Sequence, residues 1–365
     1  MPPRRSTYAH SSDVLGGLLN ATTTASDPAT IVAPMDDPST RSVSDDVAAD
    51  RISAAIASGR CVSIAGVPFL VTASAATLAT VAEMFAVAAE HPGPPALSLD
   101  VSDAPAAAPD SPPTESYGTS RLWREGDRLT FDSGCGVVAT ADSASISVRG
   151  RADGHAFAMG VRRSMHHCLA HALSLTGRAV LHGAAVARGS AAILLLGSTG
   201  SGKSTCTYLA AAAGWDVIAD DLVALWDSGG AVLATGIPRS LNVPAEALSA
   251  GDEGDDGDAL AGDARGRRRL PLPLLPEPRR VGAVAIIRHG RGPGHVTPAS
   301  ATDLVRFIVG SSPAAGHPAV ARQAFRLAGP LSAGPAVWLH TGDTADARRS
   351  VVPEQLARLL DGHRD

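Results

Sequence analysis

The sequence predicts an α/β fold in which a glycine-rich loop joins a buried strand to a helix, with a small β-rich region ahead of it. An apolar run at 191–196 precedes the loop and a helical pattern at 205–213 follows it. Strand-like and helical segments then alternate to the C-terminus, as expected for a mixed sheet with flanking helices. Ahead of the loop, three short β-like runs lie between residues 122 and 148.

The N-terminal part divides into a tail and a small α+β domain. Residues 1–45 are rich in Ser, Thr, Asp, Ala and Pro without a sustained period, which predicts a disordered tail. The predicted domain, 46–150, carries no chemical motif. Its expected elements are helices over 47–56 and 75–89, a strand–turn–strand pair over 61–71, an exposed connection over 104–119, and strands over 128–131, 136–139 and 144–148.

The predicted catalytic domain, 151–365, contains the denser signals. A helix over 156–176 is expected to end at Gly177. The strand over 180–187 is expected to form a hairpin with the one over 191–196. A charged segment at 249–270 predicts a mobile loop. The remaining expected elements are strands over 215–219, 281–287 and 336–340, and helices over 300–309, 318–327 and 353–360.

The glycine-rich loop fits the phosphate-binding pattern GxxxxGK[ST] at every defined position. Its glycines let backbone N–H groups surround a phosphate chain, and the following helix N-terminus adds a positive dipole. Lys203 would reach the β- and γ-phosphates, and the Ser204 hydroxyl would hold Mg²⁺. ATP and Mg²⁺ are therefore the expected cofactors. The predicted cofactor-binding residues are Gly197, Ser198, Thr199, Gly200, Ser201, Gly202, Lys203, Ser204 and Thr205.

Two adjacent carboxylates, Asp220 and Asp221, follow the predicted strand at 215–219. An apolar strand ending in acids, downstream of such a loop, is the arrangement that holds Mg²⁺ in phosphotransfer sites. One carboxylate can serve the metal while the other accepts a proton from a hydroxyl.

The combined pattern resembles the catalytic domain of HPr serine kinase/phosphorylase, and so predicts the HPr kinase and phosphoenolpyruvate carboxykinase-like fold. It comprises His182-Gly183, the loop, Gly214-Trp215 and Asp220-Asp221. The intervals also agree, with 21 residues from His182 to Lys203 and 17 from Ser204 to Asp221. The pattern is nearer still to the HPr-kinase-like peptide kinases of lasso-peptide and related tailoring clusters.

The resemblance implies an ATP-dependent kinase that phosphorylates a serine of a ribosomally made precursor peptide. Lys203 would neutralise the transferred phosphoryl group, and Ser204 would be a Mg²⁺ ligand. Asp221 would be the general base and Asp220 would support the metal or the geometry. His182 would lie at the edge of the site and orient Asp221 or the phosphate.

The sequence also departs from the family. The downstream Glu-x-Arg-Gly-x-Gly signature is not found, and the surroundings of Glu246 do not match it, so phosphorylase activity and HPr as substrate are not expected. Two alternatives stay open: a kinase of a small molecule such as free serine, and a nucleotide-binding regulatory module without transfer. A carboxykinase-like enzyme is disfavoured because no metal-binding His/Lys set is visible.

Two further groups of polar residues have simpler interpretations. His167 and His171 share a helical face but have no third metal ligand, which favours a structural pair over a metal site. The acids at 252–258 are most simply a solvated loop. The arginines at 265–269 are equally consistent with such a loop and with a lid that closes on phosphate.

Composition limits partners and location. The net charge of −5 and pI near 6.2 indicate neither nucleic acid nor membrane as a partner. The four cysteines form no CxxC pair, which fits a reducing cytoplasm. No apolar run approaches the roughly 20 residues that a membrane span needs, and no secretory signal is visible. The sequence leaves the oligomeric state open, a homo-oligomer included.

Overall fold

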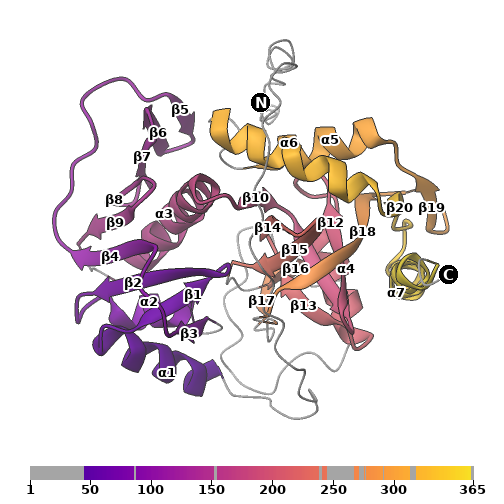
Figure 1. The fold of residues 1–365 in the computed structure, drawn as a ribbon, viewed down its shortest axis with the longest axis horizontal. Helices are drawn as coiled ribbons and strands as arrows, with labels where there is room; N and C mark the ends of the chain where they lie inside the picture. The colour runs from indigo at the N-terminus through magenta and orange to yellow at the C-terminus, as the bar shows by residue number, and fades with distance from the viewer. Residues whose placement is uncertain are drawn as a thin grey trace, which may run out of the picture. The chain divides into compact units, whose positions relative to one another are not determined.

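The computed structural model describes residues 45–85, 88–151, 154–237, 241–244, 267–270, 275, 277–290, 292–312 and 318–362. All of them belong to one compact unit, Ser42–Asp365. Most of the predicted tail and residues 249–266 of the predicted mobile loop lie outside the described residues, as does Glu246. The described chain forms a mixed α/β structure with two large sheets (Figure 1).

The first sheet has nine strands in the order β3-β1-β2-β4-β9-β8-β7-β6-β5. Strands β2, β4 and β9 run parallel to one another and the remaining pairs are antiparallel. Helix α1 (Asp45–Ala57) packs against α2 (Leu78–Met84) and contacts β1 and β2. The strands are β1 (Cys61–Ile64), β2 (Val67–Ala73), β3 (Ala89–His91), β4 (Leu97–Asp103), β5 (Glu115–Tyr117), β6 (Ser120–Glu125), β7 (Arg128–Asp132), β8 (Val137–Ala141) and β9 (Ser145–Gly150).

This sheet is larger than the sequence predicted. Strands β3, β4 and β6 were not expected, and β5 lies inside the predicted connection at 104–119. The signal for β4 was present, because Leu97, Leu99 and Val101 alternate along it and are buried. The predicted helix at 75–89 is shorter, since it begins at Leu78 and ends at Met84.

Helix α3 (Gly154–Leu175) connects the two sheets. Its buried face, which includes Phe157, Val161, Met165 and Cys168, repeats at intervals of four and three residues, as an amphipathic helix requires. This face belongs to the same hydrophobic core as the first sheet, while the helix also contacts β10 and α6. Other side chains of α3 can therefore contact the second sheet.

The second sheet runs β10-β14-β15-β18-β12-β11-β13, with β20 paired to β18 and β19 to β20. Strands β12, β18 and β20 are parallel neighbours. The strands are β10 (Ala179–His182), β11 (Ala184–Arg188), β12 (Ala191–Leu196), β13 (Asp216–Ala219), β14 (Leu222–Ser228), β15 (Ala231–Gly236), β18 (Arg279–Arg288), β19 (His295–Pro298) and β20 (Ala336–His340). A separate pair is formed by β16 (Leu241–Pro244) and β17 (Arg267–Leu270).

Helices cover both faces of the second sheet (Figure 1). Leu194 and Leu196 of β12 pack on the side of α5 and α6, whereas Ile193 and Leu195 pack on the side of α4 and α7. This alternation is what a strand between two helical layers requires. The helices are α4 (Lys203–Ala212), α5 (Ala301–Gly310), α6 (Pro318–Ser332) and α7 (Ala345–Asp361). Among the described residues, no helix is long and apolar enough to cross a membrane.

The predicted strand at 180–187 is interrupted at Gly183. Strand β10 pairs with β14, while β11 forms the expected hairpin with β12 and also pairs with β13. The Gly183 N–H donates to the carbonyl of Asp221, and a Cβ at Gly183 would lie 3.1 Å from the Leu195 carbonyl oxygen. This interruption therefore brings His182 beside the turn between β13 and β14. Strands β14 to β17 and β19 were not predicted, and β17 occupies the last four residues of the predicted mobile loop.

Candidate functional site

The glycine-rich loop joins β12 to α4, as the sequence predicted. Gly202, the residue before α4, has φ 98°, a conformation that glycine adopts at little cost. Gly197 has φ 148°, and a Cβ there would lie 2.5 Å from Ser201 Oγ and 2.9 Å from the Ile287 carbonyl oxygen. The loop path therefore depends on glycine at both positions. Its N–H groups and the start of α4 can meet an anion.

Lys203 is the only lysine in the chain, which otherwise uses arginine for its basic side chains. It is 7% exposed, and its Nζ donates to the carbonyl oxygens of Gly197 at 2.8 Å and Ser198 at 3.2 Å. Burial lowers the pKa of Lys203 to about 8, although the charge of Asp220 opposes this shift. An ammonium is compact enough to meet phosphate inside a loop, whereas the guanidinium of arginine is wide and planar.

One buried hydroxyl of the loop is left for a phosphate oxygen to satisfy. Ser201 is 6% exposed, and its Oγ has no hydrogen-bond partner among the described residues. A phosphate oxygen would satisfy this hydroxyl, since buried polar groups are nearly always hydrogen-bonded. Ser201 Oγ also fills the space that a side chain at Gly197 would take. The residues present therefore suit a bound phosphate chain.

A hydroxyl and a carboxylate lie side by side at the start of α4. Ser204 Oγ donates to Asp220 Oδ2 at 3.0 Å, and Asp220 is 3% exposed. Such oxygen ligands suit Mg²⁺, which usually takes one or two carboxylates and completes its shell with water and phosphate. The described residues contain no cluster of three or more His, Cys, Asp or Glu side chains that could hold a metal. Ser204 and Asp220 fit a Mg²⁺ shared with phosphates.

Asp221 occupies the turn that follows Asp220, with φ 81°. This conformation costs a non-glycine residue free energy, so it persists only where the surrounding structure holds it. The Asp221 carbonyl accepts from Gly183 N–H, and the carboxylate contacts two histidines. His182 Nδ1 lies 2.9 Å from Asp221 Oδ1, and His166 Nδ1 lies 3.7 Å from Oδ2. The structure thus brings His182 and Asp221 together as the sequence suggested.

His166 was missed by sequence reasoning, which singled out His167 and His171 on the same helix. His167 instead stacks on Phe131 of the first sheet, with ring centroids 4.3 Å apart. His171 is 1% exposed, and its Nε2 lies 2.8 Å from the Asp127 carbonyl oxygen. The structural interpretation of that pair therefore holds. His166 and His167 are consecutive residues that face different sides of the helix, and only the position of β10 beside α3 could have identified His166.

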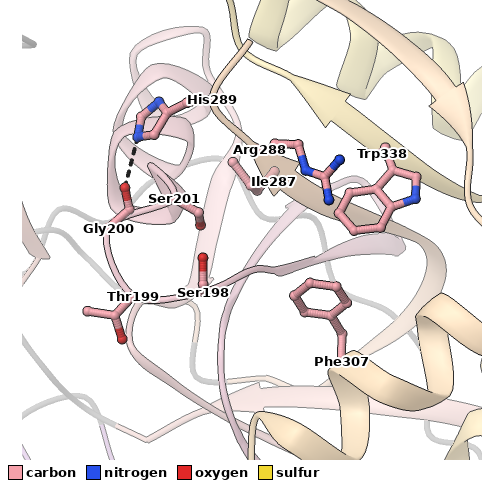
Figure 2. Close-up of a pocket in the computed structure, with 9 residues that line it drawn as sticks. All are labelled: Ser198, Thr199, Gly200, Ser201, Ile287, Arg288, His289, Phe307 and Trp338. Carbon is pink, nitrogen blue, oxygen red and sulfur yellow. Dashed lines mark hydrogen bonds between the residues drawn. The ribbon is translucent and has the colours of Figure 1, made fainter. Parts of the chain in front are cut away.

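A pocket of about 400 Å³ extends from the loop toward the ends of β18 and β20 (Figure 2). His289, just after β18, holds the loop, because its Nε2 lies 2.8 Å from the Gly200 carbonyl oxygen. Sequence reasoning identified only the loop side of this pocket. The opposite side is formed by Ile287, Arg288, His289, Phe307 and Trp338.

Comparisons with known proteins do not identify a function for this protein, so a functional proposal depends on the geometry of the site. The sequence matches no family model and no curated protein sequence. Among solved structures, the chain is similar to the Hpr(Ser) kinase/phosphatase from Coxiella burnetii at 10% sequence identity, covering 51% of this chain and 95% of that chain. The TM-score is 0.25, too low for this similarity to support a fold or a function.

Proposed function

We propose that this protein is an ATP- and Mg²⁺-dependent kinase that phosphorylates a serine hydroxyl. One observation carries the proposal: a single turn presents two carboxylates with different partners. Asp220 contacts Ser204 at the start of the loop helix, and Asp221 contacts His182 and His166. This arrangement separates a metal-binding carboxylate from a proton-accepting one, as phosphoryl transfer to a hydroxyl requires.

The loop residues would bind and orient the nucleotide. Lys203 and the N–H groups of residues 197–204 neutralise phosphate charge, and Ser204 with Asp220 would hold Mg²⁺. ATP supplies the phosphoryl group, and Mg²⁺ neutralises the charge on its phosphates. The buried position of Lys203 strengthens its attraction to an anion, because the surroundings screen charge less than water does.

Asp221 would accept the proton of the acceptor hydroxyl as the hydroxyl oxygen bonds to the γ-phosphorus and the bond from that phosphorus to the departing ADP breaks. The 2.9 Å contact with His182 holds the carboxylate in one orientation, and His166 contacts the other carboxylate oxygen. Proximity of this kind matters because a base must lie within hydrogen-bond reach of the proton it removes. His182 and His166 are therefore positioning residues.

The acceptor is proposed from the motif resemblance. The match to HPr-kinase-like peptide kinases favours a serine on a ribosomally made precursor peptide, as in lasso-peptide tailoring. Free serine would meet the same base, and a regulatory module would bind nucleotide without transfer. We place the reaction in the cytoplasm, where the free thiols of Cys61, Cys135, Cys168 and Cys206 would stay reduced.

The test is transfer of labelled phosphate from γ-labelled ATP to serine-containing peptides and to free serine. Asp221→Asn should lower kcat by about 10²–10⁴, the usual contribution of a general base. Asp216→Asn is the matched control, because Asp216 is an exposed residue at the opposite end of β13. Full transfer by Asp221→Asn would contradict the proposal, and so would ATP consumption without a phosphorylated acceptor.

A further inference from the structure

Three of the side chains that line the pocket opposite the phosphate-binding loop lie together (Figure 2). Arg288 lies at the end of β18, Phe307 on α5 and Trp338 on β20, and we call them the aromatic wall. Figure 2 shows the aromatic wall on one side and Ser198 with Thr199 on the other. The pocket thus combines phosphate-binding backbone with an aromatic surface.

The aromatic wall is held in place by contacts among its own members. The Arg288 guanidinium lies 4.1 Å from the centre of the Trp338 ring, a favourable cation–π distance. Phe307 meets Trp338 edge to face, with centroids 5.4 Å apart and an interplanar angle of 83°. Trp338 Nε1 donates to Asp303 Oδ2 at 3.4 Å. Since Phe307 and Trp338 are only partly buried, they keep ring surface for another partner.

The sheet order places this wall on the side where a nucleoside would lie. Strands β12, β18 and β20 are parallel, so the wall and the loop meet at the same edge of the sheet. Strands β11 and β13 lie on the other side of β12, and β13 leads to Asp220. A triphosphate on the loop with its terminal phosphate toward Asp220 would direct its nucleoside toward β18 and β20.

We propose that the aromatic wall is the subsite for the purine base of the nucleoside triphosphate. The ring of Phe307 and the stacked pair of Arg288 and Trp338 offer the flat surfaces that a base stacks on. The inference rests on the proposed function, because it requires the triphosphate to occupy the loop. It adds a binding site for the part of the nucleotide that the loop does not contact.

The test compares two ligands that share phosphates and differ in the base: Mg²⁺ with ATP and Mg²⁺ with inorganic tripolyphosphate. By titration calorimetry, Phe307→Ala should weaken ATP binding roughly 5- to 150-fold, the effect of losing one stacking partner. Tripolyphosphate affinity should stay within about twofold. Phe307→Leu, which keeps an apolar side chain on α5 but no aromatic ring, should likewise weaken ATP binding and leave tripolyphosphate affinity within about twofold.

The matched control is Phe325→Ala, because Phe325 is 55% exposed on α6 and does not line the pocket. It should leave both affinities unchanged. Equal losses of ATP and tripolyphosphate in Phe307→Ala, or no loss of either, would overturn the base subsite. Wild-type protein that binds both ligands equally would also overturn it while leaving the kinase proposal intact. Wild-type protein that binds neither would refute the proposed function, and the subsite with it.

Discussion

The two large sheets of this molecule bury charge in different ways. In the first sheet, Asp132 is 9% exposed, and its carboxylate accepts two hydrogen bonds from Arg121. Beside the second sheet, at the start of α4, Lys203 is 7% exposed, donates to two backbone carbonyls, and has its pKa lowered to about 8. Burying a charge without full compensation is costly. The lowered pKa of Lys203 therefore points to the second sheet as the one that carries the chemistry.

The backbone shows the same difference. Two non-glycine residues among those described have positive φ, Ala65 at 53° and Asp221 at 81°. Ala65 lies in the two-residue turn between β1 and β2, where a hairpin requires this conformation. Asp221 joins β13 to β14, which do not pair with each other. The positive φ of Ala65 is thus explained by the hairpin turn. No hairpin explains the positive φ of Asp221, whose conformation instead places its carboxylate beside His182 and His166.

For the comparison between the two sheets, the largest expected effect comes from exchanging basic side chains without changing net charge. Lys203→Arg should lower kcat/KM by about 10²–10³, because a guanidinium cannot occupy the position of the ammonium within the loop. Steady-state kinetics with ATP and the acceptor would measure this loss.

The comparison in the first sheet is Arg121→Lys. It should leave kcat/KM unchanged and cost at most about 1 kcal/mol of unfolding free energy, since Arg121 is half-exposed and its ion pair is partly screened. A large kinetic effect of Arg121→Lys, or none from Lys203→Arg, would remove the distinction between the sheets.

A smaller effect is expected for the adjacent histidines of α3, which contact different sheets. His166→Gln should lower kcat roughly 2- to 10-fold and alter its pH profile, because it removes one contact to Asp221. His167→Gln should instead lower Tm and leave the pH profile unchanged, because His167 stacks on Phe131. The same result for both variants would show that neither histidine acts through Asp221.

The features that could be predicted from the sequence are those marked by short local motifs. The loop with its flanking strand and helix was predictable because phosphate binding restricts residue type and spacing. The pair His182 and Asp221 was expected only from the motif resemblance. The sole lysine was also visible in the composition, although its importance becomes clear only once it is seen to be buried. These features depend on short-range sequence.

The remaining features depend on long-range pairing. Strands β14 and β15 were missed, so β14 could not be placed beside β10, and His166 could not be related to Asp221. The aromatic wall combines residues from β18, α5 and β20, which only the sheet order brings together. Strand order is set by packing across the whole sheet and leaves little trace in local periodicity.

The free protein has a pH dependence that follows from the lowered pKa of Lys203. Between about pH 8 and 10.5 the unfolded chain holds a proton that the folded protein has released. The contribution of Lys203 to the free energy of unfolding should therefore rise across that range, by on the order of 3 kcal/mol. The buried thiols of Cys168 and Cys206 act in the opposite direction above pH 9, because burial raises the pKa of each to about 12. Affinity for ATP should fall across the same range, because the neutral amine attracts phosphate less. The difference in unfolding free energy between the wild type and Lys203→Met isolates the Lys203 contribution, and Lys203→Met should also remove this fall in ATP affinity.

The most direct measurement of the central claim is an NMR titration of protein labelled with ¹³C and ¹⁵N at lysine. Because Lys203 is the only lysine, the side-chain signals report on it alone. We expect a pKa of about 8 in the free protein and a clear rise when Mg²⁺ and ATP are added, since phosphate stabilises the ammonium. A pKa at the ordinary value of 10.5, unchanged by Mg²⁺ and ATP, would contradict the assignment of this loop to a nucleotide.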